Sequence, residues 1–290
     1  MSWAPWHNQT AGFRDGLKEF GYEEGRNVTF EVRLAQGDQA RLPELVAKLI
    51  RTKPDLLYCV MGPEARACRK ATQTIPIVFT QAGSPVKVGL VRSFARPGGN
   101  VTGVGSLRAE LTAKRLQLFT EIVPSLRRVL VTYDRHEPEE VDAVTSARKA
   151  ADRLGLTLLE RPITSSLEVD DGLVDLQEGG ADGILMVQAG PNLNIPGRSL
   201  EGATLLNVPT MYPASYWTRV GALASYGPNQ YEGGRQAARL AHKILSGTPP
   251  GEIPVELPTA IEFTINLKTA ARIGLTVPPE VVARADHVFQ

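Results

Sequence analysis

The sequence predicts an α/β fold built from two doubly wound, Rossmann-like lobes. Short apolar runs alternate with amphipathic stretches along the chain, which is typical of parallel sheets covered by helices on both faces. The alternation occurs as two successive series. A length of 290 residues agrees with this, because one hydrophobic core rarely serves a chain of this size.

The first series predicts three strands and four helices, one of which starts at Pro63. Alternating apolar residues favour a strand over 28–34, and buried apolar runs predict two more strands. Helical spacing of apolar residues predicts the helices, the last of which ends at a Pro-Gly-Gly breaker. The other strands are expected at 56–60 and 75–80, and the other helices at 9–20, 41–51 and 84–94.

The second series repeats the pattern to the end of the chain. Strands are expected at 128–133, 156–161, 183–187, 208–212, 222–226 and 261–265. Helices are expected at 111–123, 139–154, 167–177, 192–206, 230–245 and 267–273, of which 192–206 is weak because a Pro-Gly pair interrupts it.

The charge balance argues against a nucleic-acid or membrane partner. Lysine plus arginine number 32 and aspartate plus glutamate 31, for a net charge of +1, and no basic stripe occurs. Apolar runs such as 184–187 are far shorter than the ~20 residues that a membrane-spanning helix needs. The first ten residues contain no secretory signal, which by itself suggests a cytoplasmic protein.

The two cysteines are predicted to be buried free thiols. Cys59 lies in a predicted strand and Cys68 about two turns into the following helix. A disulfide requires their α-carbons within ~7 Å, which a strand end and a distant helical turn rarely provide. We therefore expect two small apolar core residues.

No catalytic constellation is found. The chain lacks a dinucleotide fingerprint, a phosphate-binding loop and a nucleophile elbow, and its four histidines have no metal-ligand neighbours at helical spacing. His136 lies near Asp134 and Glu137, but a polar loop facing solvent or ligand is favoured over an acid–base or metal role. Glu139 and Glu140 are explained by the dipole of the helix they begin. We expect no enzymatic activity, no metal and no cofactor.

The predicted fold places the binding loops. In doubly wound sheets, ligands bind beyond the carboxyl ends of the strands, where helix N-termini point. The loops that follow these strand ends are residues 61–65, 81–85, 134–138, 188–192 and 212–216.

Several segments together resemble the substrate-binding proteins of ABC transporters that have the periplasmic-binding-protein type I fold, a group with members that bind tryptophan and other aromatic amino acids. The resemblance runs in order from about residue 9 to the end. The longest matching segments are 13–28 (FRDGLKEFGYEEGRNV), 89–103 (GLVRSFARPGGNVTG) and 265–278 (INLKTAARIGLTVP), and shorter ones include 225–228 (SYGP) and 254–259 (PVELPT).

The resemblance implies a monomeric, periplasmic or otherwise extracytoplasmic component of an ABC importer. Such a protein binds a small organic solute, an amino acid or another carboxylate, in the cleft between its lobes and delivers it to a membrane permease. The implied lobes are residues 1–104 with 222–253 and residues 105–221 with 254–290, joined by a three-segment hinge. Gly99, Gly103 and Gly221 are hinge candidates or simply turn residues.

Candidate ligand-binding residues come from both lobes. Helix N-termini after Gly62 and Gly83 suit a carboxylate. Tyr212 and Tyr216 suit an apolar ligand body, although Tyr212 has a second interpretation as a core residue at a strand end. The full set is Gly62, Glu64, Ala65, Gly83, Ser84, Asp134, Arg135, His136, Gln188, Asn192, Tyr212 and Tyr216.

Two departures from the family pattern shape the expectations. Family members commonly have Asp-Pro where this chain has Gln-Ala-Gly-Pro at 188–191, which leaves open an organic acid without an amine. The family also begins with a signal peptide and a buried strand, whereas residues 1–8 contain no apolar run for either. We therefore expect the first strand to be missing and the chain to be truncated at its start.

Two other classes remain as alternatives. A ligand-sensing domain of a transcriptional regulator shares the type I fold, but it requires an N-terminal DNA-binding module for which the first series leaves no room. An enzyme on the same scaffold lacks a catalytic set in this sequence.

Overall fold

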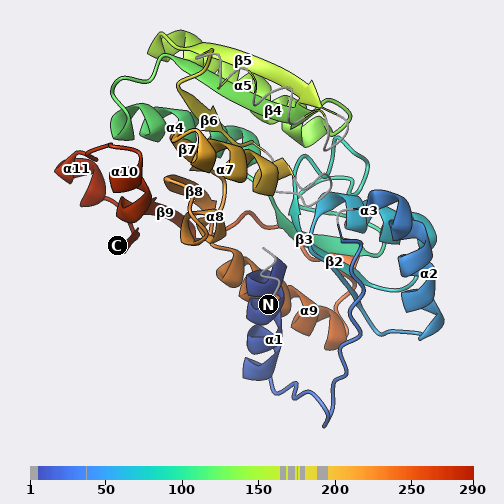
Figure 1. Cartoon of the computed structure of the whole chain (residues 1–290). Helices are drawn as coiled ribbons and strands as arrows, with labels where there is room; N and C mark the ends of the chain where they lie inside the picture. Colours follow the sequence, from blue (N-terminus) through green and yellow to red (C-terminus); the bar gives the residue numbers. More distant parts are fainter. Residues whose placement is uncertain are drawn as a thin grey trace. The chain divides into compact units, whose positions relative to one another are not determined.

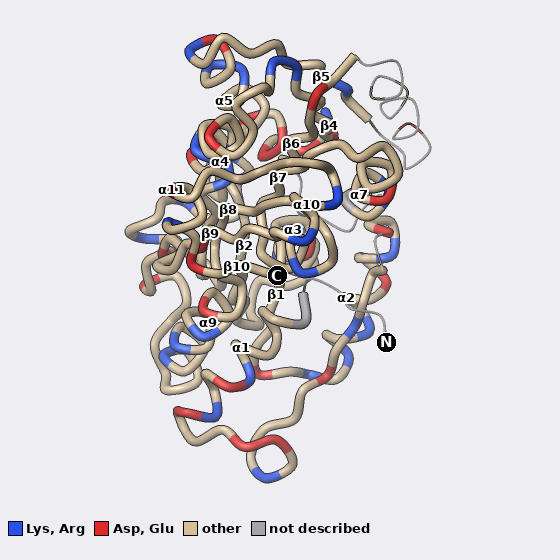
Figure 2. Tube along the Cα trace, turned by 60° about the vertical axis from the view of Figure 1, so that its left-hand side comes forward, with Lys and Arg blue, Asp and Glu red and all other residues tan. Residues whose placement is uncertain are grey.

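The computed structural model describes residues 6–36, 38–163, 168, 174, 176, 180–187 and 195–290 (Figure 1). The chain divides into two compact units. Unit 1 comprises Met1–Leu107 and Asn229–Ala260, and unit 2 comprises Arg108–Pro228 and Ile261–Gln290. Each contains a largely parallel sheet with helices packed against it, so the predicted α/β fold with two doubly wound units is confirmed. Figure 2 shows basic and acidic residues interspersed along both units.

The second and third unit boundaries lie later in the chain than expected. The predicted divisions followed residues 221 and 253, whereas the structure divides after Pro228 and Ala260. Strand β8 (Ala224–Pro228) explains the first difference, because it pairs with two strands of unit 2. Residues 253–260, here called the return segment, explain the second difference, because hydrogen bonds attach them to unit 1.

In unit 1, three parallel strands lie in the order β1-β2-β3. Central strand β2 is buried on both faces: Ile77 and Phe79 pack with one hydrophobic cluster and Val78 with the other. Helices α2 and α3 contribute to the first cluster, and α1 and α9 to the second. The elements are α1 (Trp6–Glu19), α2 (Leu42–Arg51), β1 (Leu57–Cys59), α3 (Gly62–Ala71), β2 (Ile77–Ala82), β3 (Val101–Gly105) and α9 (Gln230–Leu245), with short 3₁₀ turns at Gln39–Arg41 and Pro250–Glu252.

Residues 28–34 do not form the predicted strand. Val28 makes only an isolated bridge with Glu24, and Val32 and Leu34 are 45% and 38% exposed. A strand needs a hydrogen-bonded neighbour, and among the described residues β1 pairs with β2 alone. The prediction of a strand over 28–34 is therefore wrong. The described residues begin at Trp6 with α1, so the expectation about a first strand within residues 1–8 lies mostly outside them.

The helix predicted over 84–94 is also wrong. The segment is a series of turns in which Val88 N donates to Ser84 O at 3.1 Å and Leu90 N to Pro85 O at 2.9 Å. Left-handed backbone at Ser84 (φ +43°) and Gly89 (φ +69°) prevents a regular helix. Strand β3, which follows, was not predicted, and the hinge candidate Gly103 lies within it.

The described residues of unit 2 form seven strands in the order β10-β9-β8-β7-β6-β4-β5. The strands from β5 to β8 are parallel, and β9 runs antiparallel to β8. The predicted strands are all present; β10 was missed, and the helix predicted at 167–177 lies mostly outside the described residues. The strands are β4 (Arg128–Asp134), β5 (Thr157–Ile163), β6 (Gly183–Leu185), β7 (Thr210–Tyr212), β8, β9 (Ile261–Asn266) and β10 (His287–Phe289).

The helices of unit 2 complete two hydrophobic clusters. One cluster joins α4 and α5 to β4 and β9, and the other joins α7 to β6 and β7. Cluster assignment follows the strand pleat, since Val129 and Val131 belong to the first and Leu130 to the second. The helices are α4 (Arg108–Ile122), α5 (Pro138–Leu154), α7 (Ile195–Leu205), α8 (Ser215–Arg219), α10 (Leu267–Arg272) and α11 (Pro279–Val282).

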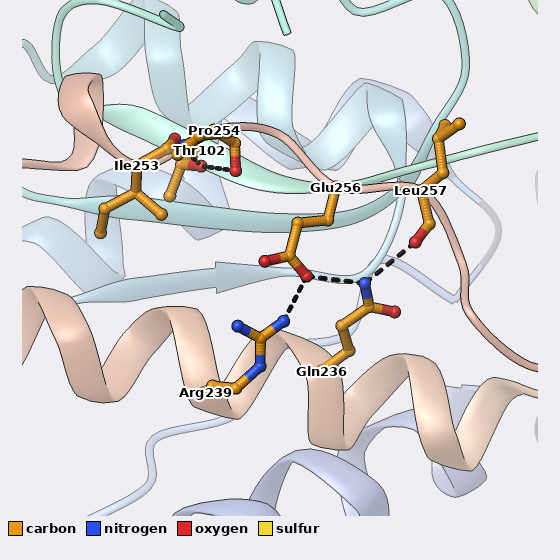
Figure 3. Close-up of polar contacts among 7 residues, drawn as sticks. All are labelled: Thr102, Gln236, Arg239, Ile253, Pro254, Glu256 and Leu257. Carbon is orange, nitrogen blue, oxygen red and sulfur yellow. Dashed lines mark hydrogen bonds and ion pairs between the residues drawn. The ribbon is translucent and has the colours of Figure 1, made fainter. Parts of the chain in front are cut away.

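The return segment is bound to unit 1 by main-chain and side-chain hydrogen bonds (Figure 3). Glu256 N donates to Gly103 O at 3.0 Å and Gly105 N to Glu256 O at 2.7 Å, as in a parallel ladder. The Glu256 carboxylate accepts hydrogen bonds from Gln236 (2.7 Å) and Arg239 of α9, and the Thr102 hydroxyl donates to Ile253 O at 2.8 Å. These contacts hold the segment against β3 until it leaves for unit 2.

Helices α1 and α9 pack with their backbones in close approach, side by side in Figure 1. Glycines make this possible. A Cβ added at Gly12 would lie 1.9 Å from Tyr231 O, and one at Gly234 would lie 2.0 Å from Gln9 O. Both clashes are with backbone, which cannot rotate away. The neighbouring Gly233 is different, because its nearest neighbour would be a side-chain nitrogen of Gln9 at 3.9 Å.

This contrast gives a matched pair of variants. We expect Gly234→Ala to lower the free energy of unfolding by about 2–3 kcal/mol, because the methyl group must push the helices apart. Gly233→Ala should leave stability unchanged or raise it by up to about 1 kcal/mol, because alanine is the better helix former. Urea unfolding measures both, and equal effects of the two substitutions would contradict the close approach.

Candidate functional site

At the carboxyl edge of the unit 1 sheet, two predicted binding loops lie together. Strands β1 and β2 are parallel neighbours, with Cys59 opposite Phe79, so the loops that follow them leave from the same edge. The Thr80 hydroxyl donates to Val60 O at 3.0 Å and ties the end of β2 to the first loop. The structure therefore brings together the loops that contain the predicted residues Gly62, Glu64, Gly83 and Ser84.

Helix α3 directs its N-terminus at this edge. It begins at Gly62, with Pro63 in its first turn, and its N-cap residue Met61 makes no side-chain hydrogen bond to the first turn. The positive end of the helix dipole thus meets no capping oxygen from Met61. Glu64 stands in the same turn and is partly buried. Ala65, also predicted to contact ligand, is instead fully buried in the core of unit 1.

The second loop of this edge has unusual backbone. Gln81 and Ser84 adopt positive φ angles of +52° and +43°, and the ladder between β2 and β3 shifts register between Phe79 and Ala82. Non-glycine residues rarely adopt such angles, and those that do cluster at functional sites. Gly83 does not begin a helix, so the dipole argument applies to α3 alone.

The carboxyl edge of unit 2 brings together another part of the predicted set. Strands β4, β6 and β7 are parallel neighbours, so Asp134 and the 212–216 segment end at one edge. Asp134 Oδ1 accepts a hydrogen bond from His136 N at 2.8 Å, which shapes the loop. Arg135 and His136 are exposed. The predicted residues Gln188 and Asn192 lie outside the described residues.

The two tyrosines of this edge have different environments. Tyr212 is fully buried in the core and packs on Trp217, with ring centroids 5.2 Å apart. Burial raises its pKa, and the interpretation as a strand-end core residue is the one the structure favours. Tyr216, on α8, is partly exposed and meets the edge of Trp217 at 5.1 Å. Tyr216 is therefore the ring of the predicted pair that retains accessible surface.

Sequence reasoning missed a buried charged cluster beside Asp134. Arg115 of α4 is 1% exposed, and its side chain bonds to the Thr112 hydroxyl. Burial, together with a smaller effect of the positive charge of Arg108, lowers the pKa of Arg115 to about 9. Arg108 and Glu139 form an ion pair at 3.5 Å in which both side chains are largely buried. Two adjacent glutamates at a helix start have the pattern of capping residues, and nothing in that pattern indicates that they are buried.

Glu140 is the most perturbed acid of this cluster. Its carboxylate accepts a hydrogen bond from Asp134 N at 2.7 Å and so joins helix α5 to the end of β4. Burial raises the pKa of Glu140 to about 7, against the opposing effects of Arg108 and of the Asp134 hydrogen bond. The interpretation of Glu140 as a dipole-stabilising residue is thus incomplete, because its oxygen contacts the strand end.

Protonation of Glu140 links stability to pH. The pKa of about 7 in the folded chain lies above 4.5, the ordinary value for a glutamate side chain. The folded state therefore binds a proton more tightly, and stability falls as pH rises from about 4.5 through about 7. We expect Glu140→Gln to be more stable than the parent above pH 7, by about 3 kcal/mol at most, and equal to it near pH 4.5. Urea unfolding at stepped pH measures this, and parallel stability curves would exclude Glu140 as the titrating group.

Two structural features bear on metal binding and on membrane insertion. Among the described residues, no group of three or more His, Cys, Asp or Glu side chains is arranged to hold a metal ion. Within the same residues, no helix has the length and apolarity needed to cross a membrane.

Several known proteins are similar to this chain in sequence and fold. A curated relative, the tyrosine-binding protein of Clostridioides difficile (strain R20291), is 30% identical over 266 residues, which cover 91% of this chain and 76% of that protein. A crystal structure of a conserved domain protein from Vibrio cholerae is 31% identical, with a TM-score of 0.86 over 97% of this chain and 94% of that one.

Two further structures share the fold. The ABC domain from Streptococcus pneumonia in complex with L-Trp is 24% identical, with a TM-score of 0.89 over 100% of this chain and 97% of that one. A ligand-free, open substrate-binding protein with adhesive properties from Clostridium difficile is 27% identical, with a TM-score of 0.70 over 98% and 94%. The family described as ABC transporter substrate binding protein matches residues 5–289. The chain belongs to the ABC transporter substrate-binding protein family.

Proposed function

We propose that this protein binds an aromatic α-amino acid outside the cytoplasm and delivers it to a membrane permease, without catalysing a reaction on it. The observation that carries the proposal is the first turn of α3. There a helix N-terminus and the Glu64 carboxylate stand at the same sheet edge. This pair complements the opposite charges of an amino-acid backbone.

The carboxylate of the solute is assigned to the start of α3. Backbone N–H groups and the positive end of a ten-residue helix favour an anion, and a partly buried edge strengthens the interaction. Glu64 is assigned to the amine, because a carboxylate accepts strong hydrogen bonds from an ammonium group. An acidic partner at Glu64 removes the need for the Asp-Pro that other members have after the corresponding strand of unit 2.

Unit 2 offers a surface that suits an aromatic ring. Tyr216 keeps exposed ring surface on α8, where a second ring can stack or meet it edge-on. The relative named for tyrosine binding supports an aromatic solute. Within unit 2, Asp134 and His136 supply polar groups at the carboxyl edge of the sheet, and Tyr212 belongs to the core.

Calorimetry with matched solutes tests the chemistry. We expect L-tyrosine or L-tryptophan to bind, and the corresponding amide to bind at least about tenfold more weakly, because it lacks the charge that α3 stabilises. The des-amino acid should lose a similar factor through Glu64. L-Arabinose serves as a control, because sugar-binding proteins share the fold. Equal affinity for an amino acid and its amide would contradict the role of α3.

A bulky substitution tests the loop after β2. Ser84→Trp should abolish binding of the solute, because the indole fills the edge beside α3, while urea unfolding should still report a folded chain. Ser246→Trp is the matched control, since Ser246 is exposed at the end of α9. If Ser84→Trp bound the solute as tightly as the parent protein does, this loop would not belong to the site.

A further inference from the structure

The two cysteines of the chain face each other in the core of unit 1. The Cys59 thiol donates a hydrogen bond to Cys68 Sγ at 3.3 Å. Both side chains are buried, with 3% and 4% of their surface exposed, and both are free. The sequence-based prediction of two buried, free thiols is confirmed, and their sulfur atoms lie 3.3 Å apart.

Elementary geometry explains why they meet. From Cys59 the chain continues for three residues to Gly62, a rise of roughly 10 Å in extended backbone. Helix α3 then turns back across the same strand, and the six residues from Gly62 to Cys68 descend roughly 9 Å. The two displacements nearly cancel. A cysteine at the end of a strand and another nine residues later on the returning helix therefore lie at the same level.

We propose that Cys59 and Cys68 form a disulfide bond that fastens α3 to β1. The sulfur atoms must approach from 3.3 Å to about 2.05 Å, a movement within reach of small side-chain rotations. Neither cysteine has an alternative partner, because the chain contains only two. The proposal rests on the geometry of unit 1 and does not depend on the identity of the solute.

The reaction requires an oxidant, which we take to be a disulfide-exchanging thiol oxidant such as a dithiol oxidase or glutathione disulfide. One cysteine thiolate attacks the disulfide of the oxidant and forms a mixed disulfide, releasing one thiol. The second cysteine then displaces the other half of the oxidant. Two protons and two electrons leave the protein, and the oxidant ends as two thiols.

The exchange takes place before unit 1 closes around the two residues. The hydrogen bond with Cys68 and burial together raise the pKa of Cys59 well above its ordinary value, so the folded form holds an unreactive thiol. In the unfolded chain both thiols are exposed and ionise normally. The bond is therefore expected in protein that folds under oxidising conditions, and its absence is expected in protein that folds in a reducing compartment.

The bond acts on the start of α3. It closes a ring that runs from Cys59 to Cys68 and includes Val60, Met61 and Gly62, the residues that set the direction of the helix N-terminus. Fixing both ends of this ring reduces the freedom of the first turn and of the unfolded chain.

Thiol counting on the full chain tests the proposal. The protein is unfolded, refolded with a mixture of reduced and oxidised glutathione, and then denatured in the presence of N-ethylmaleimide. We expect no label on the chain and an intact mass two hydrogens below that of the reduced form. Trypsin cuts after Arg66, between the cysteines, so the bond should appear as two joined peptides that separate on reduction. The oxidised form should unfold about 5 °C above the reduced form.

The variant Cys68→Ala provides the control. It should retain a single reactive thiol at Cys59, and its unfolding temperature should not respond to reductant. If the parent chain carries two labels after refolding under oxidising conditions, the proposal is wrong. The thiol count on the parent chain requires neither a folded variant nor a ligand. Its failure would therefore leave the proposed function untouched.

Discussion

The central parallel strands of this protein, such as β2 and β4, must be covered on both faces and followed by a segment that returns to the other end of the sheet. That requirement determines most of what the two units share. Within β2, Ile77 and Phe79 meet one pair of helices and Val78 the other. Each helix or long loop returns the chain to the edge where strands begin. The carboxyl ends of the parallel strands therefore lie at one and the same edge of the sheet. The edge then collects residues that are far apart in sequence, such as Asp134 and Tyr216.

The two units stabilise their edges by different means. Unit 1 uses backbone: a helix start at Gly62 and left-handed residues at Gln81 and Ser84 define its shape. Unit 2 uses buried charge: Glu140 holds the end of β4 through Asp134 N, while Arg108 neutralises Glu139 beside it. A backbone-built edge presents donors in fixed directions, whereas a charge-built edge responds to protonation. The pH dependence expected from Glu140 therefore arises in unit 2.

Much of the fold follows from local pattern, and the failures share a physical cause. Strands such as β4 and β9 were predictable because a buried strand must be apolar. The segment 28–34 has the alternating apolar pattern of a strand. A segment joins a sheet only when a neighbouring strand is available for hydrogen bonding, and the alternating pattern does not identify that neighbour. Residues 84–94 form turns and not the predicted helix, because Ser84 adopts a positive φ that serine seldom adopts. The sheet edges and their loops could be placed from topology alone. The burial of Tyr212, Ala65 and Glu140 could not, because exposure depends on elements distant in the chain.

The packing of α1 against α9 also determines when unit 1 can fold. The two helices are separated by about 210 residues, and their glycine contacts form the second layer of the unit. During synthesis at about 5–20 residues per second, α1 waits roughly 10–40 s for its partner to leave the ribosome. Phe13 and Leu17, both buried in the finished protein, lack their partners from α9 during that interval. Unit 1 therefore stays incomplete for most of the synthesis of the chain, a state suited to capture by chaperones.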